Sequence, residues 1–173
     1  PTFDIEGMDA AHKIGILSSL AFGTALPPED FYIEGISKID KIDFKYSIEM
    51  GYTIKHLAVS KMNSNNIELR VHPVLIKLNS YLANLKGVRN GIEVETDLLG
   101  TLHIAGSGAG QEATASGLIS DLVHLANSNL NFSSNEIETI PEIIDFSSLS
   151  FQYYFYIEAE DIPGVMASIT SMF

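Results

Sequence analysis

Residues 52–78 read YTIKHLAVSKMNSNNIELRVHPVLIKL, and this stretch decides the fold class. It holds two runs rich in valine and isoleucine, residues 52–62 and 66–78, which indicate β-strands. The polar residues NSNN between them predict a turn, so the two strands are expected to form a hairpin. Two further runs of the same character, residues 87–97 and 99–106, predict two more strands.

Helical patterns precede and follow these strands. Apolar residues recur at helical spacing from residue 8 to residue 22, and Gly23 follows as a stop. A short extended piece at residues 32–36 leads to a second helix, which Gly51 ends. After a glycine turn, a third helix is expected to cover the sheet. This order predicts an α+β fold, a mixed β-sheet layered with α-helices. The apolar positions are Ile14, Leu17, Leu20 and Ala21 in the first helix and Ala115, Leu118, Ile119, Leu122 and Leu125 in the third.

Three segments differ in composition. Residues 1–126 contain the helices and strands above and form the first predicted domain. Residues 127–150 are rich in serine and asparagine, which predicts a linker. Residues 151–173 predict a strand over 151–160, a DIPG turn and a final helix. Since one strand and one helix cannot bury a core, this tail needs further sequence or a partner surface, and we expect the chain to be a segment of a longer protein.

The composition limits the classes of partner. A net charge of -12 at pH 7, without a basic cluster, makes nucleic acid and anionic membrane surfaces poor partners. The absence of cysteine excludes disulfides, thiolate zinc sites and cysteine nucleophiles, and it agrees with a cytoplasmic location. The five histidines lack metal-binding spacing, so no metal site is assigned. No apolar run has the length of a membrane span.

The start of the first helix carries three charged residues at close spacing. In TFDIEGMDAAHK, residues 2–13, Asp4 precedes Asp9 by five residues and Asp9 precedes Lys13 by four. Such a helical ion pair contributes about 0.2–0.5 kcal/mol, and either aspartate can cap the helix. Spacing alone favours this structural interpretation. The alternative is that the helix start opens into a cleft, where Lys13 acts as a general acid toward a carbonyl oxygen and the carboxylates place the lysine and the substrate.

A second candidate lies just before the last helix of the first domain. The stretch GSGAGQEATAS, residues 106–116, places Gly106, Gly108 and Gly110 ahead of that helix. Glycines in such a position can bring backbone N–H groups close to an anion or a cofactor. The spacing is not the dinucleotide-binding GxGxxG, so the residues alone favour an ordinary turn into the helix.

Taken in order, these stretches resemble the homoserine dehydrogenase family over residues 3–126. The helix start DIEGMDAAHKIGILSSLAFG resembles the family signature, in which D-x-x-G-x-D-x-A-x-K opens a helix. The tail YYFYIEAEDIPGVMASITSMF resembles the first strand and helix of an ACT regulatory domain, so residues 151–173 are expected to begin such a unit. Further blocks that resemble the family are FYIEGI, GYTIKHLAV, LRVHPVLI, GVRNGIEVETDLLG and GSGAGQEATASGLISDL.

The resemblance implies an activity and a role for each candidate residue. The family interconverts L-aspartate 4-semialdehyde and L-homoserine with NAD or NADP. Lys13 takes the place of the catalytic lysine, which gives a proton to the aldehyde oxygen as hydride arrives. Asp9 and Asp4 take the places of acids that bind or orient the substrate. On this basis catalysis explains the spacing of Asp9 and Lys13 better than a surface ion pair does. The positions that match the cofactor-contacting segment are Gly108, Gly110 and Thr114.

The resemblance also implies partners. The family binds the dinucleotide mainly through a Rossmann domain, which we do not find in this sequence, and its glutamate for the substrate amine is expected just before Pro1. We expect a homodimer through the strand layer, because an open sheet of apolar strands needs its edge or face covered. An amino-acid effector is expected at the ACT unit.

A hypothesis from a different class is a non-catalytic module that binds an amino acid or serves only for oligomerisation. The ACT-like tail suggests it. This hypothesis predicts an exposed and dispensable Lys13, whereas the enzyme hypothesis predicts that Lys13 lies in a cleft with Asp9 within hydrogen-bond reach of it or of the substrate.

Overall fold

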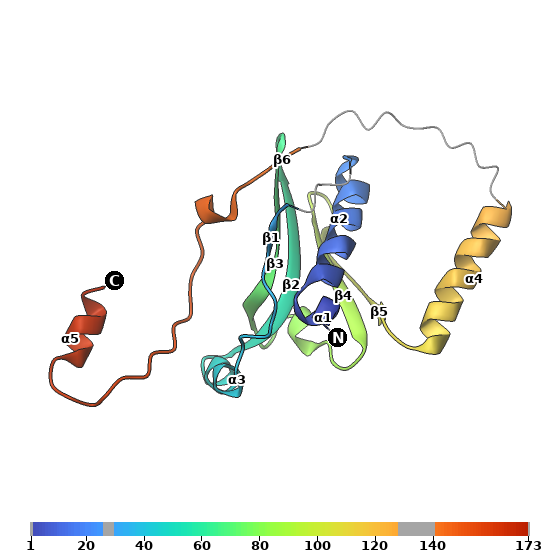
Figure 1. Ribbon diagram of the computed structural model, residues 1–173. Helices are drawn as coiled ribbons and strands as arrows, with labels where there is room; N and C mark the ends of the chain where they lie inside the picture. The colour runs from blue at the N-terminus through green and yellow to red at the C-terminus, as the bar shows by residue number, and fades with distance from the viewer. Residues whose placement is uncertain (1, 26–29, 128–140, 173) are drawn as a thin grey trace.

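Figure 1 shows the computed structural model, which describes residues 2–25, 30–127 and 141–172. No helix within these ranges is both long enough and apolar enough to cross a membrane. The helices are α1 (Thr2–Ile5), α2 (Met8–Phe22), α3 (Lys41–Glu49), α4 (Gln111–Asn127) and α5 (Val165–Thr170), with the 3-10 turns η1 (Leu82–Asn84) and η2 (Phe146–Ser148). The strands are β1 (Tyr32–Ile33), β2 (Tyr52–Asn63), β3 (Asn66–Lys77), β4 (Arg89–Thr96), β5 (Gly100–Ser107) and β6 (Glu142–Ile143).

The long hairpin of β2 and β3 forms the centre of the fold. Its antiparallel register ends at the pair Asn63 and Asn66, so the connecting turn has two residues, and Ser64 adopts a left-handed backbone with φ of 55°. The other edge of β3 pairs in parallel with the short strands β1 and β6. The hairpin predicted from NSNN is therefore confirmed, and the sheet is mixed, as the α+β fold class requires.

Strand β3 supplies most of the core. Ile67, Leu69 and Val71 are at most 2% exposed and alternate along the strand, so they share one face of the sheet. On the opposite face Glu68 and Arg70 are also buried, and the Nε of Arg70 donates to the Oε1 of Glu68 at 2.7 Å. Both faces of β3 are thus covered, one by apolar packing and one by an ion pair.

Helix α2 packs against β2 and β3, as Figure 1 shows, through a stripe of small residues. The buried positions are Ala11, Gly15 and Ser18, and the hydroxyl of Ser18 donates to that of Ser60 in β2 at 2.7 Å. The left-handed Gly23 ends the helix, as predicted. The apolar positions from which we predicted the helix lie on another face, and Leu20 is 77% exposed. Small side chains allow the helix backbone to approach the sheet closely, so the buried stripe is not the most hydrophobic one.

Strands β4 and β5 form a separate antiparallel ribbon, which leads into α4. The ammonium of Lys55 in β2 donates to the carbonyl of Leu85 at 2.7 Å and links the main sheet to the segment before the ribbon. Figure 1 shows α4 standing away from the main sheet, and none of its residues is buried. The expectation that this helix covers the sheet is wrong within the described residues. Its apolar face exists but lies open, with Leu118 63% exposed.

The C-terminal segment returns to the sheet before it leaves again. Within the predicted linker, residues 128–140 lie outside the described part of the chain, whereas β6 pairs with β3 and η2 follows it. The guanidinium of Arg70 lies over the ring of Phe151, 4.9 Å from its centroid. The strand predicted over residues 151–160 is wrong within the described residues, because this segment pairs with no other strand there and runs as irregular extended chain.

Candidate functional site

The turn between α1 and α2 places the first candidate residues. Gly7 adopts the left-handed conformation with φ of 86°, its N–H donates to the carbonyl of Asp4 at 3.2 Å, and its carbonyl accepts from Ala11 at 2.9 Å. Glycine populates this conformation without the steric cost that a side chain brings. Gly7 therefore ends α1 and starts α2, and it fixes the direction in which Asp9 leaves the first turn of α2.

Asp9 and Lys13 meet on one side of α2. The Nζ of Lys13 donates to the Oδ2 of Asp9 at 2.5 Å, and the two side chains are 55% and 39% exposed. An ammonium group carries three N–H donors, so this bond leaves donors that can reach an oxygen of a bound molecule. The structure thus brings together two of the three charged residues singled out in the sequence. Among the residues that the structure describes, Asp4 is linked to this pair through the backbone, where its carbonyl accepts from the N–H of Gly7.

A segment far along the chain supports this turn, and we did not name it as a candidate site from the sequence. Residues 34–36 follow β1 and run beside α1, where the N–H of Ile36 donates to the carbonyl of Ile5 at 2.9 Å. Gly35 packs so closely that an added Cβ would lie 2.8 Å from the Cα of Glu6. The available signal was the block FYIEGI, whose glycine has no turn or helix end to explain it.

The glycine turn between β5 and α4 holds the remaining candidates. Gly110 has φ of 117°, and both the N–H and the hydroxyl of Thr114 donate to its carbonyl, at 3.1 and 3.0 Å. The N–H of Gly108 donates to the carbonyl of Val88 at 2.9 Å, which closes the ribbon onto the turn. In the described part of the chain no hydrogen bond or ion pair joins this turn to Asp9 or Lys13.

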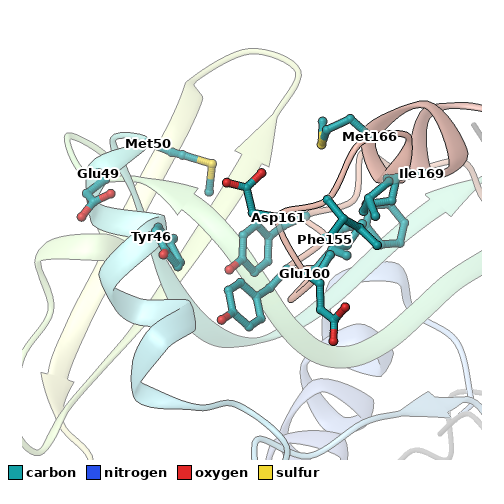
Figure 2. Close-up of a pocket in the computed structure, with 14 residues that line it drawn as sticks. Tyr46, Glu49, Met50, Phe155, Glu160, Asp161, Met166 and Ile169 are labelled. Atoms are coloured by element: carbon teal, nitrogen blue, oxygen red, sulfur yellow. The ribbon is translucent and has the colours of Figure 1, made fainter.

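A cavity of about 650 Å³ lies elsewhere, between α3, the extended residues 154–162 and α5. Figure 2 shows Tyr46, Glu49 and Met50 on one side of it and Met166 and Ile169 on the other, with further acids between them. No lysine or arginine is among its lining residues, so it offers no cationic partner for a carboxylate. Among the described residues, no group of three histidine, aspartate or glutamate side chains could hold a metal ion.

Comparisons with known proteins agree on one family. A family model described as homoserine dehydrogenase matches residues 1–123. Homoserine dehydrogenase of Pseudomonas aeruginosa is 40% identical in an alignment 182 positions long, gaps included, which covers 99% of this chain and 42% of that protein. The crystal structure of a homoserine dehydrogenase from Thiobacillus denitrificans has a TM-score of 0.81 at 37% identity and is matched over 99% of this chain and 42% of that one.

A more distant solved structure is the hyperthermophilic archaeal homoserine dehydrogenase in complex with NADPH, with a TM-score of 0.57 at 29% identity, covering 75% of this chain and 36% of that one. Across these comparisons the chain spans about two fifths of the length of the proteins it matches. The family model covers the Gly7 turn, the Asp9 and Lys13 pair and the glycine turn alike. The chain belongs to the homoserine dehydrogenase family.

Proposed function

We propose that this chain is the substrate-binding and subunit-contact segment of a homoserine dehydrogenase, which interconverts L-aspartate 4-semialdehyde and L-homoserine with NAD or NADP. The observation that carries the proposal is the contact of 2.5 Å between Lys13 and Asp9. Asp9 follows the left-handed Gly7 by two residues, and both residues of the contact belong to a pattern of acids, glycine and lysine that resembles the family signature. We expect the enzyme to work in the cytoplasm.

In this proposal Lys13 moves a proton at the substrate oxygen. During reduction its ammonium gives a proton to the aldehyde oxygen, which becomes the hydroxyl of homoserine, and in the reverse direction the amine accepts that proton. The bound nicotinamide supplies the hydride that the aldehyde carbon takes up. Asp9 holds the ammonium in place through its hydrogen bond and contacts the substrate together with Asp4. Because Lys13 is 55% exposed, water can restore its proton after each turnover.

Within the glycine turn, Gly110 is better suited than Gly108 to contact the dinucleotide. A Cβ added to Gly110 would meet no neighbouring atom within 4 Å, so a large ligand can approach the backbone there. A Cβ added to Gly108 would clash with the side chain of Asn90, so the space beside this glycine is already filled. We therefore expect Gly110 and Thr114 to flank the cofactor, with Gly108 shaping the turn, and a separate nucleotide-binding domain to make most of the contacts.

A second function remains a candidate because of one observation. The exposure of Lys13 is what a non-catalytic amino-acid-binding or oligomerisation module predicts, since such a module does not need the lysine in a cleft. The hydrogen bond to Asp9 satisfies the enzyme hypothesis, but a surface ion pair makes the same bond. A test of activity must therefore separate the two functions.

The test uses a hybrid enzyme, in which residues 1–173 replace the matching segment of the Pseudomonas aeruginosa homoserine dehydrogenase. Oxidation of L-homoserine is followed by the absorbance of the reduced nicotinamide. We expect Lys13→Ala to lower kcat at least 100-fold, which corresponds to about 2.7 kcal/mol. Lys86→Ala removes an exposed lysine that is not among the candidate site residues and serves as the matched control.

Each outcome decides between the functions. Loss of activity in Lys13→Ala alone, with the melting temperature unchanged, supports proton transfer by Lys13. Equal activity in both variants returns Lys13 to a surface ion pair and contradicts its proposed role. A folded hybrid enzyme that oxidises no homoserine before any substitution would contradict the dehydrogenase proposal and favour the binding module.

A further inference from the structure

His56, in the middle of β2, reaches across to the segment that follows β1. Its register partner in β3 is Pro73. The Nε2 of His56 lies 2.8 Å from the carbonyl oxygen of Glu34. A carbonyl oxygen only accepts hydrogen bonds, so Nε2 carries a proton and donates it. This bond ties the centre of the sheet to residues 34–36.

The same imidazole ring contacts the turn that starts α2. A Cβ built on Gly7 would lie 3.1 Å from the Cε1 and 3.2 Å from the Nε2 of His56, and 3.1 Å from a methyl group of Val71. These distances are tighter than ordinary van der Waals contacts, so Gly7 lies directly on the ring edge. His56 and Val71 thus form the surface on which the turn rests.

Residues 34–36 hold the turn from another side. The N–H of Glu34 donates to the carbonyl of Val71 at 2.8 Å, and the N–H of Ile36 donates to the carbonyl of Ile5 at 2.9 Å. Gly35, between them, lies against the backbone of Ile5 and Glu6. The short segment Ile5–Gly7 is therefore enclosed by the sheet and by residues 34–36, and His56 contacts both.

We propose that His56 is a positioning residue for the reaction: by bonding the carbonyl of Glu34 and supporting Gly7, it sets the direction in which α2 presents Asp9 and Lys13. The inference rests on the proposed function. Asp9 and Lys13 follow Gly7 by two and six residues on one continuous helix, so a rotation at Gly7 displaces both side chains together. A displacement of about 1 Å at reacting groups is enough to lower a rate by about 100-fold.

A purely structural role for His56 makes different predictions. If the ring only fills space, leucine, which has similar bulk and no N–H, should replace it with little effect. If the hydrogen bond positions the turn, His56→Leu should fail and His56→Gln should restore function, because glutamine presents an N–H donor in place of Nε2. His103→Leu is the control, since His103 bonds Glu93 in the β4–β5 ribbon at 2.9 Å and lies outside this site.

The first experiment needs no activity. Amide hydrogen exchange is measured by NMR on the 173-residue chain carrying His56, His56→Leu, His56→Gln or His103→Leu. We expect His56→Leu to speed exchange about tenfold at the N–H groups of Ile36 and Ala11, which bond Ile5 and Gly7, and His56→Gln to return both rates to near those of the unsubstituted chain. Unchanged exchange in His56→Leu overturns the proposal.

The second experiment repeats these substitutions in the hybrid enzyme. We expect His56→Leu to lower kcat for L-homoserine oxidation at least tenfold while the KM for the dinucleotide stays unchanged, with recovery in His56→Gln. Faster exchange with an unchanged kcat also overturns the proposal, because the turn would then be held without consequence for the reaction. If Lys13→Ala abolishes activity but His56→Leu does not, the proposed function stands and only the role of His56 fails.

Discussion

The ring of Phe146 stacks on the ring of Tyr32, with centroids 3.7 Å apart and planes inclined by 4°. Phe146 belongs to η2 in the C-terminal segment, whereas Tyr32 opens β1, two residues before Glu34. The ring of His72 meets both of them at a steep angle, with centroid distances of 6.0 and 5.5 Å. The C-terminal segment is therefore attached to the strand that leads into the supports of the Gly7 turn.

Removal of this ring should loosen the attachment. Phe146→Ala deletes the stacked ring, which is half-buried, and we expect it to cost about 2 kcal/mol of the free energy of unfolding. Urea unfolding measures the loss, and amide exchange at Ile144, whose N–H donates to Ile67, reports whether β6 opens first. Leu98→Ala removes an apolar side chain that is 89% exposed and is expected to change the stability little. Equal losses in the two variants would contradict a specific role for the stack.

The ion pair of Glu68 and Arg70 makes a second prediction about stability. Both side chains are 10% exposed, and Arg70 also contacts His72 and the ring of Phe151. Glu68→Ala leaves the guanidinium in the sheet without its carboxylate, which we expect to cost about 3 kcal/mol.

The pair of Glu93 and His103 provides the matched comparison for that prediction. Its side chains are each 35% exposed, so solvent screens the interaction. Glu93→Ala is therefore expected to cost less than about 1 kcal/mol in the same urea experiment. If Glu68→Ala lowers the free energy of unfolding no more than Glu93→Ala does, burial does not strengthen the ion pair of Glu68 and Arg70.

Tyr32 makes the stability depend on alkaline pH. Burial, and then the hydrogen bond from its hydroxyl to Glu34 at 2.8 Å and the charge of that carboxylate, raise the pKa of Tyr32 from 10.0 to about 12. Between these values the unfolded chain releases the phenolic proton while the folded chain keeps it. The contribution of Tyr32 is therefore fully present below pH 10 and is lost as the pH rises toward 12.

Tyr32→Phe should remove this part of the pH dependence, because phenylalanine does not titrate. Urea midpoints measured from pH 9 to pH 12 give the slope for each variant, and the difference between the phenolate absorbance titrations of the two proteins isolates the pKa of Tyr32 from those of the other tyrosines. Glu34→Gln keeps an acceptor for the hydroxyl but removes the carboxylate charge. It should therefore lower the pKa of Tyr32 in the folded chain and narrow the pH range over which the stability falls. An identical slope in Tyr32→Phe would exclude Tyr32 as its source.

The hairpin could be predicted from sequence because its signal is local. Alternating β-branched residues and the polar turn at Ser64 specify β2 and β3 without help from the rest of the chain. The buried face of α2 could not be predicted from sequence. Ala11 and Gly15 pack there because they are small, and a search for apolar periodicity overlooks small residues. The apolar face of α4 was identified, but its partner does not lie among the described residues.

The part of the site that depends on local sequence could also be predicted, whereas the part that depends on long-range contacts could not. Asp9 and Lys13 are four residues apart on one helix, so their contact follows from helical geometry. The contact of His56 with Gly7 joins residues far apart in the chain, and β2 gives no local sign of it. The roles of Asp4, Asp9, Lys13, Gly108, Gly110 and Thr114 in catalysis and binding, and the ACT unit with its effector, stay predictions.

The outer edge of β2 leads to a prediction about assembly. In the described sheet β2 is the last strand, so along Tyr52–Asn63 about every second N–H has no strand partner. We expect two copies to cover this strand layer in a homodimer, since long unpaired edges associate. Sedimentation at micromolar concentration should give the mass of a dimer, and the outward amides of β2 should exchange slowly and lose their protection on dilution. A monomer at that concentration, or outward amides that exchange fast in the dimer, would contradict pairing through β2.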